Sequence, residues 1–190
     1  MSMRPWDLAS YRIRRKFLKL FGASFRVYDG DQLVAFCKQQ AFTLREDIRL
    51  FADESRSHEL LAIKARSALD FAAAYDVVDS QTREAVGTLR RRGFASLVRD
   101  NWEVLDDAGR SLGTVSEDST AMALLRRFLS NLIPQSFELR GPRGGAVTLA
   151  QRFNPVIYTL EVRVPADVAI DRRLVFAAAV LIAAIEGRQE

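Results

Sequence analysis

Four stretches of the chain share one pattern of apolar and polar positions. Each begins with an aromatic residue, has an apolar residue two positions later, reaches a turn rich in Asp and Gly, and ends in an apolar segment. Alternation with a period of two is typical of a half-buried strand, and Asp and Gly favour the tight turn between two strands. The pattern predicts four β-hairpins, which begin at Ser24, Ala74, Asn101 and Ser136 and carry the aromatic residues Phe25, Tyr75, Trp102 and Phe137.

Further strands are predicted between these hairpins. Residues 42–51, 59–66 and 156–164 place apolar side chains on one face, and the segment around Tyr11, Ile13 and Phe17 indicates another strand. The total is about twelve. A hairpin cannot bury its apolar face alone, and an antiparallel sheet of this size loses its exposed edges by closing into a barrel. We therefore expect a closed antiparallel barrel.

The most apolar run of the sequence, LVFAAAVLIAAI at 174–185, predicts a helix inside this barrel. Twelve helical residues span roughly 18 Å, whereas the core of a bilayer requires about 30 Å. Asp171 can cap the start of the helix and Gly187 its end, so the helix is complete at this length. Twelve strands close a barrel roughly 24 Å wide, and an Ala-rich helix about 10 Å across fits within it.

One or two short helices are expected outside the barrel. Residues 118–134 have apolar side chains at helical spacing and end at a proline, and residues 94–100 form a weaker candidate. No linker divides the chain, so residues 1–190 are expected to form a single domain with its core at about 11–186. The predicted fold class is mainly β, with the barrel enclosing the C-terminal helix.

The composition indicates a soluble, cytoplasmic protein. Apolar residues make up 48% of the chain and charged residues 27%, and the first residues lack the apolar stretch of a signal peptide. The single cysteine excludes an internal disulfide, which suits a reducing compartment. The net charge of +4 allows anionic partners without requiring them.

No catalytic residue, metal site or cofactor is predicted. One cysteine and one histidine cannot complete the usual ligand sets of zinc. We interpret His58 as a solvated loop residue and Cys37 as a buried, inert thiol. The segment GPRGG at 141–145 is interpreted as a hairpin turn. A phosphate-binding loop is followed by Lys and then Ser or Thr at the start of a helix, and neither feature follows this segment. Enzymatic activity is not expected.

An ordered set of segments resembles a known family. From about Tyr11 to Ile185 these segments are YRIRRKFL, AFTLREDIRLFAD, AAYDVVDS, VGTLRRRGFASLVRDNWEVLDD, GRSLGTVSEDS, RFNPVIYTLEVRVP and DRRLVFAAAVLIAAI. They resemble the LURP-one-related and phospholipid-scramblase-like family, which has a tubby-like fold. The resemblance implies a twelve-stranded barrel around a hydrophobic C-terminal helix, and a connection with membrane lipids, including phosphoinositides.

One departure from this family concerns calcium. Animal scramblases carry an acidic calcium-binding segment just before the final helix. Here the corresponding segment, RVPADVAIDRRL, contributes only Asp167 and Asp171, too few oxygen ligands for a calcium site. Phospholipid scrambling is therefore the least favoured of the functions that the resemblance suggests.

Clusters of basic residues are the remaining candidates for a binding site. Solvated charge at strand ends and on helix faces is the simplest explanation of these clusters, but basic residues beside apolar ones also suit a membrane interface. The candidates for binding anionic lipid are Arg12, Arg14, Arg15, Lys16, Lys19, Arg90, Arg91, Arg92, Arg126, Arg127, Arg172 and Arg173.

The sequence leaves two main functions open. The favoured one is a module that binds anionic phospholipid or phosphoinositide headgroups at the inner face of the membrane. The alternative is a protein-interaction or scaffold domain, with an unidentified protein partner and no small-molecule ligand. Nucleic-acid binding is less favoured, because the basic charge is not accompanied by a recognition motif.

Overall fold

All four predicted hairpins are present in the computed structural model, which describes residues 4–18, 22–39, 47–66, 74–92, 101–117, 134–152, 154 and 157–185. Their first aromatic residues are all buried, as the alternation predicts. The hairpins are β2–β3 (Gly22–Asp29 and Gln32–Gln39), β6–β7 (Ala74–Asp79 and Ala85–Arg91), β8–β9 (Trp102–Leu105 and Ser111–Glu117) and β10–β11 (Ser136–Arg140 and Val147–Arg152).

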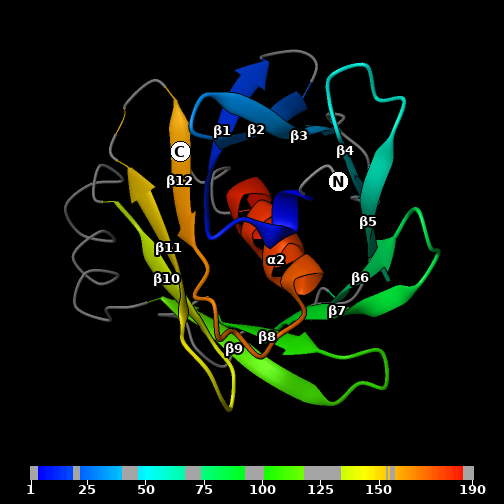
Figure 1. The fold of residues 1–190 in the computed structure, drawn as a ribbon, viewed down its shortest axis with the longest axis vertical. Helices are drawn as coiled ribbons and strands as arrows, with labels where there is room; N and C mark the ends of the chain where they lie inside the picture. Colours follow the sequence, from blue (N-terminus) through cyan, green and yellow to red (C-terminus); the bar gives the residue numbers. More distant parts are fainter. Residues whose placement is uncertain are drawn as a thin grey trace.

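Four further strands complete the sheet: β1 (Ser10–Leu18), β4 (Ile48–Phe51), β5 (Glu59–Ala65) and β12 (Tyr158–Arg163). Within the described residues, twelve antiparallel strands follow one another around the wall, and β1 pairs with both β2 and β12 (Figure 1). The predicted closed barrel is confirmed. Every wall contact joins neighbours in the sequence except the pair β1–β12, which closes the barrel.

Two strand boundaries differ from the prediction. Of the segment 42–51, the strand covers only Ile48–Phe51, and residues 42–46 lie outside the described residues. The last strand begins at Tyr158 rather than at residue 156, and Ile157 is 43% exposed. Inclusion of Ile157 in this strand was therefore wrong.

Helix α2 (Arg172–Ile185) lies along the axis of the barrel (Figure 1). Every residue from Leu174 to Ala184 is buried, so the apolar run is enclosed by the strands. Asp171 caps the helix as predicted, because its Oδ1 accepts a hydrogen bond of 2.8 Å from the backbone N–H of Arg173. Gly187, the predicted end, lies outside the described residues.

A short 3-10 helix, η1 (Pro5–Asp7), was not predicted. It lies against α2 (Figure 1), where the Trp6 ring meets the Phe176 ring edge-on at a centroid distance of 6.3 Å. The Arg172 guanidinium donates hydrogen bonds to the carbonyl oxygens of Asp7 and Leu8. The N-terminal segment therefore covers the end of the barrel at which α2 begins.

The predicted outer helices at 94–100 and 118–134 fall outside the described residues, apart from Pro134. Among the described helices, none combines the length and the apolar character needed to cross a bilayer.

Candidate functional site

The basic residues of β1 point alternately into and out of the barrel. Arg15 pairs with Phe25 on one side and Tyr158 on the other, and all three are buried. The Arg15 guanidinium lies over the Phe25 ring, 5.4 Å from its centroid. Arg14 and Lys16 are exposed on the outer surface. The prediction that Arg15 lies on a lipid-binding surface was therefore wrong, because strand alternation directs it inward.

Three other candidates, two on strands and Arg92 directly after β7, already have partners. Arg12 lies 3.4 Å from the Asp31 carboxylate and donates to the carbonyl oxygen of Gly30. Arg90 and Arg92 share one carboxylate, that of Glu103, at 2.7 and 3.3 Å. The hydrogen bond from Arg90 is the main cause that lowers the pKa of Glu103, against the effect of burial. These three arginines are therefore at least partly neutralised.

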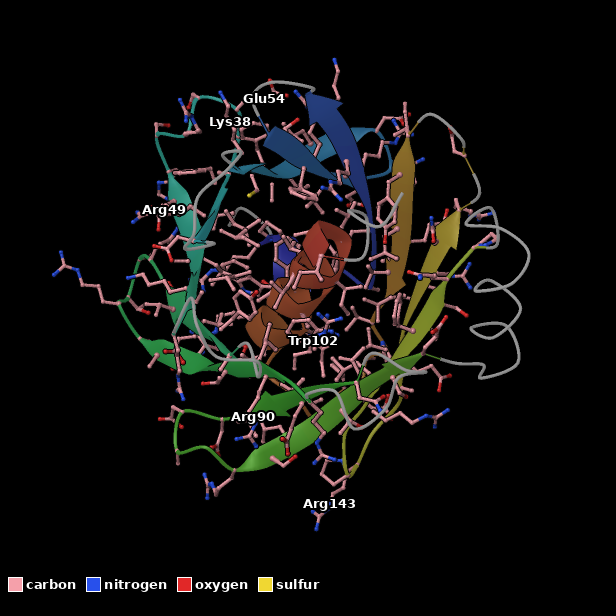
Figure 2. The ribbon with its side chains drawn as sticks, turned by 180° about the vertical axis from the view of Figure 1, so that it is seen from behind. Lys38, Arg49, Glu54, Arg90, Trp102 and Arg143 are labelled. Atoms are coloured by element: carbon pink, nitrogen blue, oxygen red, sulfur yellow. The ribbon has the colours of Figure 1, made fainter. Side chains whose placement is uncertain are left out.

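Arg91 is half-buried, and its guanidinium lies 5.9 Å from the centre of the Trp102 ring. Trp102 is buried inside the barrel, whereas Arg90 points away from α2 (Figure 2). Arg90 and Arg91 thus lie on opposite faces of β7, and Arg92 follows the end of the strand. It does not form one continuous basic surface.

Arg172 and Arg173 attach the start of α2 to the barrel. Arg172 donates to backbone carbonyl oxygens, and Arg173 contacts the carboxylates of Asp171, Glu84 and Asp79 at 2.7, 2.7 and 3.2 Å. Arg173 therefore lies among acidic side chains, which makes it a poor contact for an anion. The remaining candidates, Lys19, Arg126 and Arg127, lie outside the described residues.

The outer surface of β1, β2 and β3 carries a cluster of cations that we call the basic face: Arg14, Lys16, Arg26 and Lys38. The strand register aligns Arg14 with Arg26, and aligns Lys16 with Ser24 and then with Lys38. Because adjacent strands are about 4.8 Å apart, the backbones at Lys16 and Lys38 are roughly 10 Å apart. Arg14, Lys16 and Lys38 are exposed and form no ion pair with any described residue.

Aromatic rings support the two arginines of the basic face. The Arg14 guanidinium lies 5.3 Å from the centre of the Tyr28 ring, and the Arg26 guanidinium lies 5.5 Å from that of Phe36. Cation–π contacts of this kind orient a guanidinium without consuming its hydrogen-bond donors. The N–H groups of Arg14 are therefore accessible to an anionic ligand.

One exposed apolar side chain, Ile157, lies just before the start of β12, the strand that pairs with β1. It directly precedes Tyr158, which pairs with Arg15 of β1. Among the described residues, Ile157 is the large apolar side chain with substantial exposure. Its backbone N–H donates to Oδ1 of Asn154 at 3.0 Å.

The family model for LURP-one-related proteins matches residues 33–183, more than half of the 190-residue chain. The chain belongs to the LURP-one-related family. No curated protein matches it. In this LURP-one-related barrel, β1 and β2 precede the matched region, so three of the four cations of the basic face lie outside it and Lys38 lies inside.

Lys38 was missed in the sequence, although a signal was present. The sequence places Cys37 in a strand as a buried residue, and the next residue of a strand points to the opposite side. Alternation alone could therefore have placed Lys38 on the outer surface. Only the β2–β3 register, which includes a shift between Val27 and Tyr28, shows that Lys38 aligns with Ser24.

The structure shows the environment of each residue and segment that was considered for catalysis or phosphate binding. Cys37 is fully buried, and burial raises the pKa of its thiol to about 12, so it stays protonated and inert. His58 is exposed, with its Nε2 atom 2.7 Å from Nε2 of Gln81. The GPRGG segment forms the turn between β10 and β11, where Gly144 has a φ of 81°. These observations confirm the interpretation of Cys37 as a buried thiol and that of GPRGG as a turn.

We predict that neither calcium nor zinc at micromolar concentration raises the melting temperature of the protein. A metal that binds the native state specifically must stabilise it by mass action. Among the described residues, His, Cys, Asp and Glu side chains form no group of three or more that could hold a metal ion. Differential scanning fluorimetry tests this prediction, which a chelator-reversible rise of several degrees would contradict.

Proposed function

We propose that this LURP-one-related protein is a non-enzymatic module that binds anionic lipid surfaces through the basic face. The proposal is carried by one observation. Arg14, Lys16 and Lys38 are exposed together, and they have no acidic partner among the described residues. A cytoplasmic protein with this surface would bind peripherally to the inner face of the membrane.

Electrostatics within the fold supports a ligand at this position. Arg14 and Arg26 are directly opposite on β1 and β2, and like charges in such a pair destabilise a sheet. Basic side chains near a negatively charged leaflet each contribute about 1 kcal/mol to binding. Glu54 offsets the charge of Arg26, whereas Arg14 has no acidic partner among the described residues, so an anionic surface would supply the counter-charge that Arg14 lacks.

Ile157 favours a lipid surface over a soluble anion. Interfacial binding combines basic side chains with an apolar residue that enters the boundary of the acyl chains. Ile157 directly precedes Tyr158, the partner of Arg15 on β1, and its exposed side chain supplies the apolar part of this combination. Scrambling is less well supported, because the apolar residues of α2 are buried inside the barrel rather than available to lipid.

We predict that the wild-type protein binds vesicles of phosphatidylcholine mixed with phosphatidylglycerol and ignores vesicles of phosphatidylcholine alone. Lys16→Ala combined with Lys38→Ala should lower the affinity by roughly thirtyfold, which corresponds to about 1 kcal/mol for each lysine. Added salt should weaken binding further, because exposed charges are screened beyond about 8 Å at physiological ionic strength. Vesicle flotation across a series of lipid concentrations measures all three effects.

Arg143→Ala combined with Arg163→Ala is the matched control. These arginines are also exposed and take part in no ion pair between described residues, and Arg163 pairs with Ser10 at the opposite end of β1 from Lys16. The control removes the same total charge and should retain most of the binding. Equal flotation with neutral and anionic vesicles, or equal losses in both double variants, would contradict the proposal. A protein-interaction domain would then be the better explanation.

A further inference from the structure

One acidic side chain lies in contact with the basic face. Oε1 of Glu54, in the turn between β4 and β5, is 2.6 Å from Nε of Arg26. The two residues are 28 positions apart in the sequence, so the contact is made by the fold. Figure 2 shows Glu54 on the same side of the barrel as Lys38.

Arg26 is the central cation of the basic face. It aligns with Arg14 on β1, and its neighbour on the outer side of β2, Ser24, aligns with Lys16 and Lys38. Glu54 therefore neutralises the cation that lies between the exposed ones. Of the four cations, Arg26 is the one with an ionic partner among the described residues.

The ion pair is not needed to hold Arg26 in place. Nη1 of Arg26 donates to Oγ of Ser24 at 3.2 Å, and the guanidinium also lies over the Phe36 ring. The Glu54 side chain is 53% exposed, so it can move into solvent without opening the core. Ion pairs with this degree of exposure contribute little to stability.

We propose that Glu54 competes with the anionic lipid headgroup for Arg26 and thereby lowers the affinity of the basic face. This inference rests on the proposed function. A carboxylate and a phosphate accept hydrogen bonds from a guanidinium in the same way, so the two anions occupy the same donors of Arg26 in turn. Glu54 acts as an internal competitor that an arriving headgroup must displace.

The test uses Glu54→Gln and the same vesicles of phosphatidylcholine with phosphatidylglycerol. Removing the competing charge should raise the affinity by about two- to fivefold, the range expected for loss of one exposed ion pair. The melting temperature should stay close to that of wild type. Unchanged or weaker binding by this variant would overturn the inference.

Glu138→Gln controls for the change in net charge. Glu138 also forms an ion pair with an arginine, Arg140, but it lies on β10, four strands from β2 around the barrel. Charges separated by that length of wall are screened in physiological salt. This variant should bind as wild type does, and an equal gain from Glu138→Gln would show that only net charge matters.

The Arg26→Ala background tests whether Glu54 lowers lipid affinity by occupying Arg26 or only by its negative charge. In this background Glu54 has no guanidinium to occupy, so adding Glu54→Gln should give no further gain. A full gain in affinity from Glu54→Gln without Arg26 would overturn the proposed competition.

The proposed function and the proposed competition are contradicted by different results. If wild type does not bind anionic vesicles, the proposed function is wrong, whereas normal binding with an inert Glu54→Gln change rejects only the competition.

Discussion

Ala178→Glu should prevent the protein from folding. Ala178 lies in the middle of α2 and is 4% exposed, with the strands of the barrel around it. An unpaired carboxylate in a packed core costs several kcal/mol, comparable with the entire stability of a domain at about 5–15 kcal/mol. Circular dichroism should show loss of the strand signal and no cooperative thermal transition.

The matched control is Ala108→Glu. Ala108 is exposed in the turn between β8 and β9, so the same substitution there places the carboxylate in water. This variant should unfold within a few degrees of wild type. A cooperative transition near the wild-type temperature for Ala178→Glu would mean that α2 lies outside the barrel.

Local patterns were sufficient to predict most of the fold. Each hairpin combines two alternating segments with a turn, so its existence depends only on residues that are close in the sequence. The apolar run of α2 is too short for a bilayer and apolar on all sides, which leaves burial as the stable solution. The helix η1 could not be predicted in this way. It has three residues, and the contact of Trp6 with Phe176 joins two ends of the chain.

The candidate site was less predictable, because charge in the sequence does not show whether a cation is paired. Of the partners of Arg173, only Asp171 is close in the sequence, whereas Asp79 and Glu84 are 94 and 89 positions away. Glu103 reaches Arg90 only through the β7–β8 register. Arg15 is different, since the buried positions Tyr11 and Ile13 already imply by alternation that Arg15 points inward.

Arg173→Met should destabilise the protein without preventing folding. In wild type, Arg173 joins the start of α2 to the β6–β7 hairpin, and Asp79 is 2% exposed. Methionine leaves this buried carboxylate with only the backbone N–H groups of Gln81 and Thr82 as partners. Loss of a buried ionic partner costs roughly 3–5 kcal/mol, and the two remaining hydrogen bonds reduce that to about 2–3 kcal/mol. The melting temperature should fall by roughly 5–10 °C.

Arg173→Met combined with Asp79→Asn separates the two possible causes of the lost stability, which are the uncompensated carboxylate and the lost packing of the arginine side chain. If the cost arises from the uncompensated carboxylate, the double variant should be more stable than Arg173→Met alone. Arg143→Met, at an exposed position of the β10–β11 turn, should unfold as wild type does. A double variant less stable than the single one would place the main cost in lost packing.

The pH dependence of the difference in stability between wild type and Arg173→Met provides an independent test. Burial works to raise the pKa of Asp79, but hydrogen bonds from Thr82, Gln81 and Arg173 outweigh it, so the pKa lies below its usual value. A carboxyl whose pKa is lower in the folded state stabilises that state above its unfolded pKa, about 3.9 for Asp, and this contribution is lost as the pH falls through the folded pKa. Asp171 and Glu84 also contact Arg173, each at 2.7 Å.

The difference in melting temperature between wild type and Arg173→Met should therefore be largest near neutral pH and shrink as the pH falls below about 4. Without the guanidinium, burial has more weight in setting the pKa of Asp79, so this carboxyl takes up its proton at a higher pH in the variant than in wild type. Once Asp79 is protonated in both proteins, loss of its ion pair with Arg173 no longer distinguishes them. Thermal unfolding followed by circular dichroism from pH 7 downwards measures the difference. If it stays constant across this range, Arg173 stabilises the barrel through its methylene groups and not through its charge.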